Sequence, residues 1–137
     1  FAVFSTALPE PVKIIKMTIG QQAATVDGKP YTLDAEPFLD AQADRTLVPI
    51  RFVSEALGAV VDWTVATRLV TIKDTNREII LTIGSKEVKV DGLGQTIDCA
   101  PLILPPGRTF VPLRFVSETL GATVDYNHAM KEITIKR

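Results

Sequence analysis

Several residue types are scarce in this 137-residue chain, which contains one cysteine, one histidine and one tryptophan. A lone cysteine cannot form an intrachain disulfide, so the hydrophobic core must supply the stability of the fold. Cys99 is interpreted as a small apolar core residue rather than a reactive nucleophile. No apolar run approaches the length of a membrane-spanning helix, so we expect no membrane span in these residues.

Metal ligands and clustered positive charge are equally scarce. One histidine, one cysteine and two methionines cannot supply a conventional copper site, and we expect neither copper nor another cofactor. His128 is predicted to lie in an exposed turn. The net charge is −1 and no block of lysine and arginine occurs, which argues against nucleic acid as a partner. The glycines are isolated, so no phosphate-binding loop is indicated.

The most informative feature that the chain does contain is a segment written twice. Residues 45–62 read RTLVPIRFVSEALGAVVD and residues 108–125 read RTFVPLRFVSETLGATVD, with fourteen of the eighteen positions identical. Shorter matches extend the repeat, upstream at an offset of 64 residues and downstream at an offset of 63. The sequence therefore predicts one duplicated module with two repeats, residues 13–73 and 78–137.

Residues 1–12 lie outside the repeat and are interpreted as the remnant of a leader or a linker. Their apolar start, followed by the small residues Ser5, Thr6 and Ala7, is typical of the end of a signal peptide. We therefore expect export, and an extracytoplasmic protein that is secreted or associated with the cell surface. An ordinary first strand is the alternative interpretation of these residues.

Each repeat carries the same signals for strands, a turn and one helix. An Asp-Gly pair at residues 27–28, and again at 91–92, predicts a hairpin between two short strands. A strand pair is also expected after the helix. The fold class is therefore predicted to be α+β and β-rich, with two tandem pseudo-symmetric units, each a small antiparallel sheet curled around one short helix.

The helix of the first repeat is predicted from Pro49, which suits a first helical position, to Gly58, which suits a left-handed cap. Its apolar stripe includes Phe52, Val53 and Leu57. The equivalent helix of the second repeat follows Pro112 and ends at Gly121, and its stripe includes Phe115, Val116 and Leu120.

A unit of about 60 residues without a disulfide or a metal buries little surface and is marginal alone. Only three residues, 74–76, separate the last strand of the first repeat from the Ile-rich start of the second. These two strands are therefore expected to pair with each other. We predict a core shared by the two repeats, and one cooperative unfolding transition.

The repeated string RT-x-VP-x-RFVSE-x-LGA-x-VD, followed by an aromatic residue and a Thr-Ile-Lys strand, resembles the copper amine oxidase N-terminal, or stalk, domain family, in two copies. The resemblance implies an extracytoplasmic module of bacterial surface or secreted proteins, built from an antiparallel sheet curled around a helix. It does not imply amine oxidation, since that chemistry belongs to a separate catalytic domain. It implies no catalytic or metal-binding residue in this chain.

Two pairs of charged residues, Arg51 with Glu55 and Arg114 with Glu118, are each spaced one helical turn apart. The simplest interpretation is an ion pair on the solvated face of each helix. The alternatives are an anion site at the arginines or acid–base chemistry at the carboxylates. No nucleophile–base pair is indicated, because the serines of these helices have no histidine near them in the sequence.

Two aromatic residues, Trp63 and Tyr126, occupy equivalent positions of the two repeats. We expect both to cap the core, because each lies in a predicted strand among apolar residues. As the alternative, they form exposed platforms on which sugar rings stack. Exposure of Trp63 separates the two interpretations, because a buried indole offers no platform.

The function predicted from these observations is a non-catalytic structural or interaction module that spaces, attaches or pairs other domains at a bacterial cell surface. Its partners would be the other domains of a larger surface protein. The alternative is a module that binds cell-wall or other polysaccharide through Trp63, Tyr126 or the paired Arg/Glu faces. A hydrolase that uses two carboxylates in one cleft is the third candidate.

Overall fold

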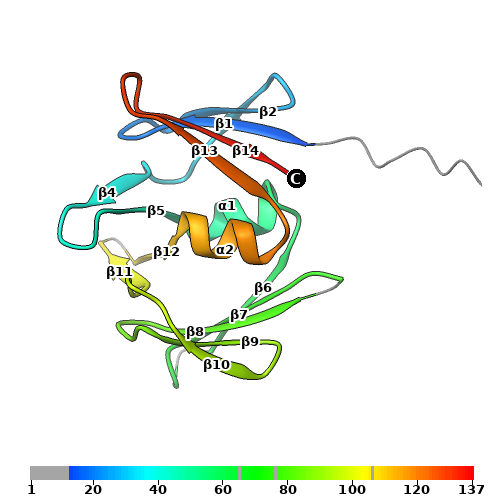
Figure 1. The fold of residues 1–137 in the computed structure, drawn as a ribbon, viewed down its shortest axis with the longest axis vertical. Coiled ribbons are helices and arrows are strands. Elements are labelled where there is room, and N and C mark those ends of the chain that lie inside the picture. Colours follow the sequence, from blue (N-terminus) through cyan, green and yellow to red (C-terminus); the bar gives the residue numbers. More distant parts are fainter. Residues whose placement is uncertain (1–12, 65, 76, 106) are drawn as a thin grey trace, which may run out of the picture.

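The computed structural model describes residues 13–64, 66–75, 77–105 and 107–137, which form three antiparallel sheets and two short helices. Two five-stranded sheets lie at opposite ends of the molecule, and a middle layer between them holds both helices and a four-stranded sheet (Figure 1). The β-rich class predicted from the sequence is therefore confirmed.

The upper sheet of Figure 1 combines the start of the chain with its end. Its order is β13-β14-β1-β2-β3, and β1 pairs with β14 so that Ile14 lies opposite Lys136. The strands are β13 (Thr123–Asn127), β14 (Glu132–Lys136), β1 (Ile14–Thr18), β2 (Ala23–Val26) and β3 (Lys29–Thr32).

The lower sheet joins the end of the first repeat to the start of the second, in the order β10-β9-β8-β7-β6. β7 and β8 pair in antiparallel register, as predicted from the short connection between the repeats. The strands are β6 (Val60–Thr64), β7 (Leu69–Lys73), β8 (Glu78–Thr82), β9 (Glu87–Val90) and β10 (Leu93–Thr96).

The middle sheet has the order β11-β12-β5-β4, and each repeat contributes two of its strands. Its two central strands lead directly into the helices α1 (Ile50–Glu55) and α2 (Leu113–Thr119). The strands are β4 (Phe38–Asp40), β5 (Arg45–Pro49), β11 (Leu102–Leu104) and β12 (Arg108–Pro112).

The prediction that each repeat forms a sheet of its own is wrong, because every sheet contains strands from both repeats. The physical reason lies in the connection between them. A short turn holds β7 and β8 together, with a hydrogen bond from the Asp74 amide to the Arg77 carbonyl at 3.0 Å. The free side of β1 is then filled by β14, which leaves fewer unpaired backbone groups.

The predicted hairpins and helix ends follow their local chemistry. Asp27 and Gly28 have φ of 53° and 78°, as a two-residue turn with two left-handed positions requires. Gly58 and Gly121, with φ of 76° and 93°, end the helices in the left-handed conformation. Pro49 was predicted to be the first helical residue, but it caps α1, and the helix begins one residue later at Ile50.

One large core connects the two five-stranded sheets through the helices, as the shared-core prediction required. Val53, Leu57, Val116 and Leu120 are at most 5% exposed, which confirms the predicted helix stripes. Cys99 is buried in a smaller cluster with Leu47 and Phe110, and burial raises the pKa of its thiol. Among the described residues, no helix is long and apolar enough to cross a bilayer.

Candidate functional site

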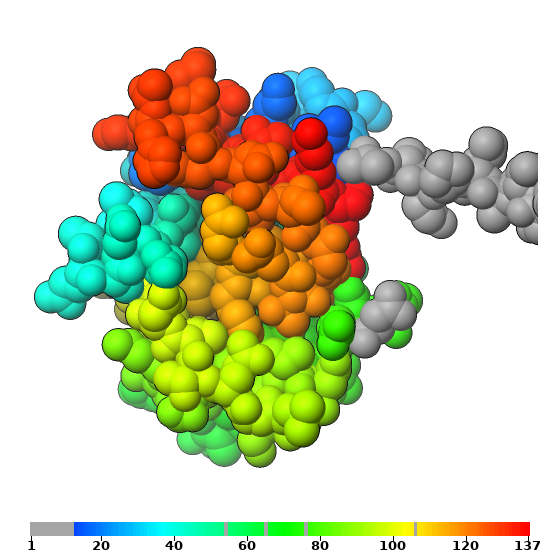
Figure 2. All heavy atoms as spheres, viewed as in Figure 1, coloured from blue at the N-terminus to red at the C-terminus, as the bar shows by residue number. Residues whose placement is uncertain are grey.

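A cleft lies beside α2, where the upper sheet, the middle sheet and the lower sheet approach one another. We call it the α2 cleft, and its volume is about 750 Å³. Figure 2 shows this face of the molecule, on which the β4–β5 segment (cyan) projects beside α2 and β13 (orange). The lining residues are Leu39, Asp44, Arg45, Thr46, Thr96, Ile97, Asp98, Pro112, Leu113, Arg114, Phe115, Glu118, Val124, Tyr126, His128 and Ile133.

The helix α2 presents its charged side to this cleft because its apolar side is used by the core. Leu113, Val116 and Leu120 are buried, whereas Arg114 and Glu118 are exposed on the opposite face. The guanidinium of Arg114 lies 3.6 Å from the carboxylate of Glu118. The predicted i,i+4 ion pair is therefore confirmed, and it forms part of the rim of the cleft.

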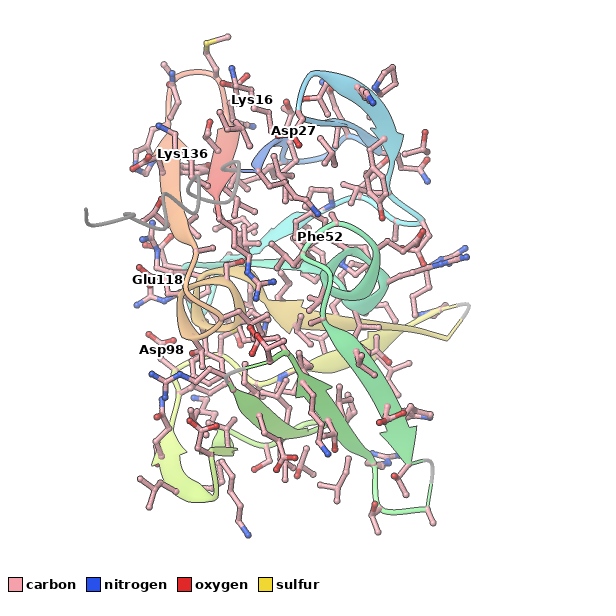
Figure 3. The ribbon with its side chains drawn as sticks, turned by 90° about the vertical axis from the view of Figure 1, so that its right-hand side faces the viewer. Lys16, Asp27, Phe52, Asp98, Glu118 and Lys136 are labelled. Carbon is pink, nitrogen blue, oxygen red and sulfur yellow. The ribbon has the colours of Figure 1, made fainter. Side chains whose placement is uncertain are left out.

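A second ion pair on the rim joins the two repeats. The guanidinium of Arg45 lies 2.6 Å from the carboxylate of Asp98, which follows β10. Glu118 and Asp98 lie on the same side of the molecule (Figure 3). Arg45 and Asp98 were not predicted as cleft residues, because nothing local in the chain indicates that they meet.

Two aromatic rings border the same cleft at the end of β13. Tyr126 is half-buried against the main core, and the exposed ring of His128 meets it edge-on with centroids 4.3 Å apart. The prediction that Tyr126 caps the core is confirmed, and His128 lies in the exposed turn predicted for it. The structure thus brings Tyr126, Arg114 and Glu118 together in one cleft.

The smaller cleft, which we call the α1 cleft, has a volume of about 190 Å³ and no charged residue in its lining. At the repeat offsets of 63 and 64, each of its residues corresponds to a residue of the α2 cleft. Trp63 stands at the position of Tyr126 and is 39% exposed, so the prediction of a core residue is wrong for Trp63. The lining residues are Ile50, Val61, Trp63, Val70, Ile103, Gly107 and Thr109.

Arg51 and Glu55 form the predicted ion pair on α1, with 2.9 Å between their charged groups, but they do not line the α1 cleft. Tyr31 of β3 lies close enough to this pair for both charges to act on its phenol. Burial, followed by the charges of Glu55 and Asp34, raises the pKa of Tyr31 to about 12. The charged side of α1 therefore lies beside Tyr31, whereas that of α2 faces the open cleft.

The two phenylalanines of the repeated string also differ in exposure, and the one in α2 is the more exposed. Phe52 of α1 is 1% exposed and lies inside the molecule (Figure 3), as predicted. Phe115 of α2 is half-buried and lines the α2 cleft, so the core prediction holds only in part for this residue. Within the described residues, no group of three or more histidine, cysteine or acidic side chains is placed to hold a metal ion.

Fold and clefts together define a β-rich domain of three antiparallel sheets with two short helices. The family model of the copper amine oxidase N-terminal domain matches residues 25–135 of this chain, which is most of its length. The chain belongs to that family. The family model matches once, across both repeats, and this corrects the prediction of two separate copies of the domain.

A curated relative was found in Brevibacillus choshinensis, where the protein is named "Protease inhibitor". It is 27% identical to this chain over 120 residues, which cover 88% of the chain and 34% of the relative. The chain therefore spans about a third of the length of the relative that it matches.

Proposed function

We propose that this chain is a non-catalytic interaction module that works outside the cytoplasm, where it attaches or pairs other domains of a bacterial surface or secreted protein. The α2 cleft carries this proposal, because it combines an apolar wall with a rim of polar and charged groups. Membership of the family supports it. So does the name of the relative, since inhibition of a protease requires that one protein bind another.

The state of the carboxylates in the cleft favours binding over catalysis. Asp98 is held by Arg45 and Glu118 by Arg114, so these carboxylates are bonded into the rim rather than aimed at a reacting atom. The third candidate, a hydrolase, needs two carboxylates that flank a scissile bond. The ion-paired arrangement gives that candidate no support.

We also infer that the two repeats descend from one duplicated unit and fold as a pseudo-symmetric pair. The support comes from the order of elements, since β5, α1 and β6 are followed 63 residues later by β12, α2 and β13. Two ion pairs also correspond across the repeats, Arg45 with Asp98 and Arg108 with Asp34. The shared sheets join the two repeats into one body, which suits a module that holds partners in place.

Binding to cell envelopes of the encoding organism tests the proposed function. The fluorescently labelled chain is mixed with envelopes that retain their proteins and with sacculi stripped of protein. Binding only to the protein-retaining envelopes is the expected result. Absence of binding to either preparation would contradict the proposal, as would turnover of a substrate by the chain. Residual activity of trypsin and subtilisin in the presence of the chain tests whether the partner is a protease.

Polysaccharide binding is the second candidate, favoured by the exposure of Trp63 and by the grouping of Tyr126 with Arg114 and Glu118. Trp63 is the only tryptophan, so its fluorescence reports on the α1 cleft alone. A saturable shift in emission on adding peptidoglycan fragments would support the candidate at Trp63. Equal binding to stripped sacculi and to protein-retaining envelopes would favour polysaccharide over a protein partner.

A further inference from the structure

The α2 cleft is bordered by one edge strand from each of the three sheets. Val124 and Tyr126 belong to β13, Leu39 to β4 and Thr96 to β10, and all four line the cleft. In the described part of the chain, β13 pairs only with β14, β4 only with β5, and β10 only with β9. An edge strand carries a row of backbone N–H and C=O groups that no neighbouring strand uses.

We propose that the α2 cleft binds one extended polypeptide segment, which adds to the upper sheet as a strand beside β13. This inference rests on the proposed interaction function and names its site and the chemistry of its partner. β13 is the favoured edge because it has five residues, whereas β4 has three and β10 has four. An added strand gains affinity from main-chain hydrogen bonds and specificity from alternate side chains.

The side chains of the cleft define which segment fits. Phe115 of α2, Val124 of β13 and Ile133 of β14 form the apolar wall of the cleft. Successive residues of a strand point to opposite faces, so every second residue of the bound segment faces this wall. The segment that fits therefore has apolar residues at alternate positions.

The charges of the rim add a requirement for a basic residue. Three carboxylates (Asp44, Asp98 and Glu118) and two guanidinium groups (Arg45 and Arg114) line the cleft. Two of the carboxylates are neutralised by the arginines, at 2.6 and 3.6 Å. Asp44 forms no ion pair within the described residues and is exposed at the turn after β4. A lysine or arginine of the segment complements this remaining negative charge.

The α1 cleft does not meet the same requirements, although it is bordered by the edge strands β6 and β11. Its volume of about 190 Å³ is below the roughly 300 Å³ at which ligand pockets begin. Its lining has no charged residue, and Gly107 stands at the repeat position of Asp44. The inference therefore specifies one bound segment per chain, despite the duplication.

The test begins with selection of binding peptides from a random decapeptide phage library on the intact chain. Enriched peptides are synthesised, and their affinities are measured by fluorescence anisotropy with the wild-type chain and with variants. Leu39→Glu is the main variant and Ile103→Glu is its matched control, since these residues are 47% and 41% exposed at equivalent positions of the repeats. Both substitutions lie at the surface, so both variants are expected to fold.

The inference predicts that Leu39→Glu weakens peptide binding about 10-fold or more, whereas Ile103→Glu changes it by less than about two-fold. Asp44→Asn should weaken basic peptides about three-fold or more, with less effect at high salt. Methylation of single peptide nitrogens should abolish binding at alternate positions only, because every second residue points its N–H toward β13.

Four outcomes would overturn the inference. Peptides that bind Leu39→Glu as tightly as the wild type would place the site elsewhere. Loss of binding at every methylated position, without alternation, would show that the segment does not add as a strand beside β13. The cleft would be assigned to a glycan if no peptide were enriched and if the chain bound oligomers of N-acetylglucosamine that Leu39→Glu no longer bound. Envelope proteins that bind wild type and Leu39→Glu equally would leave the proposed function standing and refute only this site.

Discussion

The two clefts occupy equivalent positions of the repeated sequence but differ in size and chemistry. The α2 cleft has a volume of about 750 Å³ and a charged rim, whereas the α1 cleft has about 190 Å³ and no charged lining residue. The difference arises outside the string of highest identity. Tyr31 packs against the core near Glu55 of α1, whereas its counterpart Gln95 is exposed.

This difference teaches that the duplicated string maintains the interior, and that the residues around it decide what each surface can bind. The buried helix positions are alike in the two repeats, with Val53 and Leu57 matched by Val116 and Leu120. The positions that border the clefts have diverged, with Trp63 in place of Tyr126. The two repeats therefore have similar interiors and different surfaces.

Division of the chain between the repeats should have the largest effect. Residues 13–75 and 76–137, produced separately, should show no cooperative folding, since each five-stranded sheet needs strands from both halves. The intact chain should unfold in one calorimetric transition. Circular dichroism of each half is the measurement. Two halves that fold stably alone would show that the sheets do not depend on one another.

Truncation of the two equivalent phenylalanines should destabilise the fold to different extents in the two helices. Phe52→Ala should lower the free energy of unfolding by about 3–5 kcal/mol, because the side chain is fully buried. Phe115→Ala should cost roughly half as much or less, because that ring is partly exposed in the α2 cleft. Urea denaturation of both variants gives the comparison, and equal costs would contradict the difference between the clefts.

Truncation of the equivalent leucines should show the similarity of the interior. Leu57→Ala and Leu120→Ala remove side chains that are 3% and 5% exposed, and each should cost about 2–5 kcal/mol. The two values should agree within about 1 kcal/mol if the core treats the helices alike. A thermally silent substitution at either position would show that the assigned core face is wrong.

The two ion pairs that join the repeats should contribute unequally. Arg108→Gln should cost about 1–3 kcal/mol, because it leaves the carboxylate of Asp34 without its ion-pair partner. The other oxygen of that carboxylate, Oδ1, is already buried without a hydrogen-bond partner among the described residues. Arg45→Gln should cost less than about 1 kcal/mol, since Arg45 and Asp98 are both well exposed. Chemical denaturation measures both, and recovery of stability in the double variant Arg108→Gln, Asp34→Asn provides the control.

Alkaline pH should lower the stability of the fold through one residue near α1, Tyr31. The pKa of Tyr31 is raised to about 12 in the folded chain, above its ordinary value of 10.0. The neutral phenol therefore stabilises the fold fully below pH 10, and this contribution disappears as the pH rises toward 12. Absorbance of phenolate, compared between the wild type and Tyr31→Phe, is the measurement. A Tyr31 that ionises near pH 10 would remove this distinction.

The local features of the fold could be predicted from sequence because each has a local physical cause. The Asp-Gly pairs at residues 27–28 and 91–92 predicted the hairpins, since these residues tolerate positive φ. The helix stripes followed from the spacing of apolar residues. The pairing of β7 with β8 followed from the short connection between the repeats, which leaves no room for a longer path.

The candidate site could be predicted only in part. Tyr126, Arg114 and Glu118 were candidates in the sequence because of their chemical type and their repetition, and the structure places them in one cleft. Arg45 and Asp98 were missed because they meet only when strands from different repeats come together. Trp63 was assigned to the core because its neighbours are apolar, and that pattern does not show whether another segment covers the ring.

The sequence by itself determined the β-rich class, the turns, the helix ends and the duplicated core positions of this protein, because all of these depend on residues close together in the chain. Only the tertiary structure decided which strands share a sheet and which of two equivalent clefts stays open. The physical reason is that the pairing of β1 with β14 joins residues more than 100 positions apart. A pattern within one repeat specifies which face of a strand is apolar, but not which distant strand covers its edge.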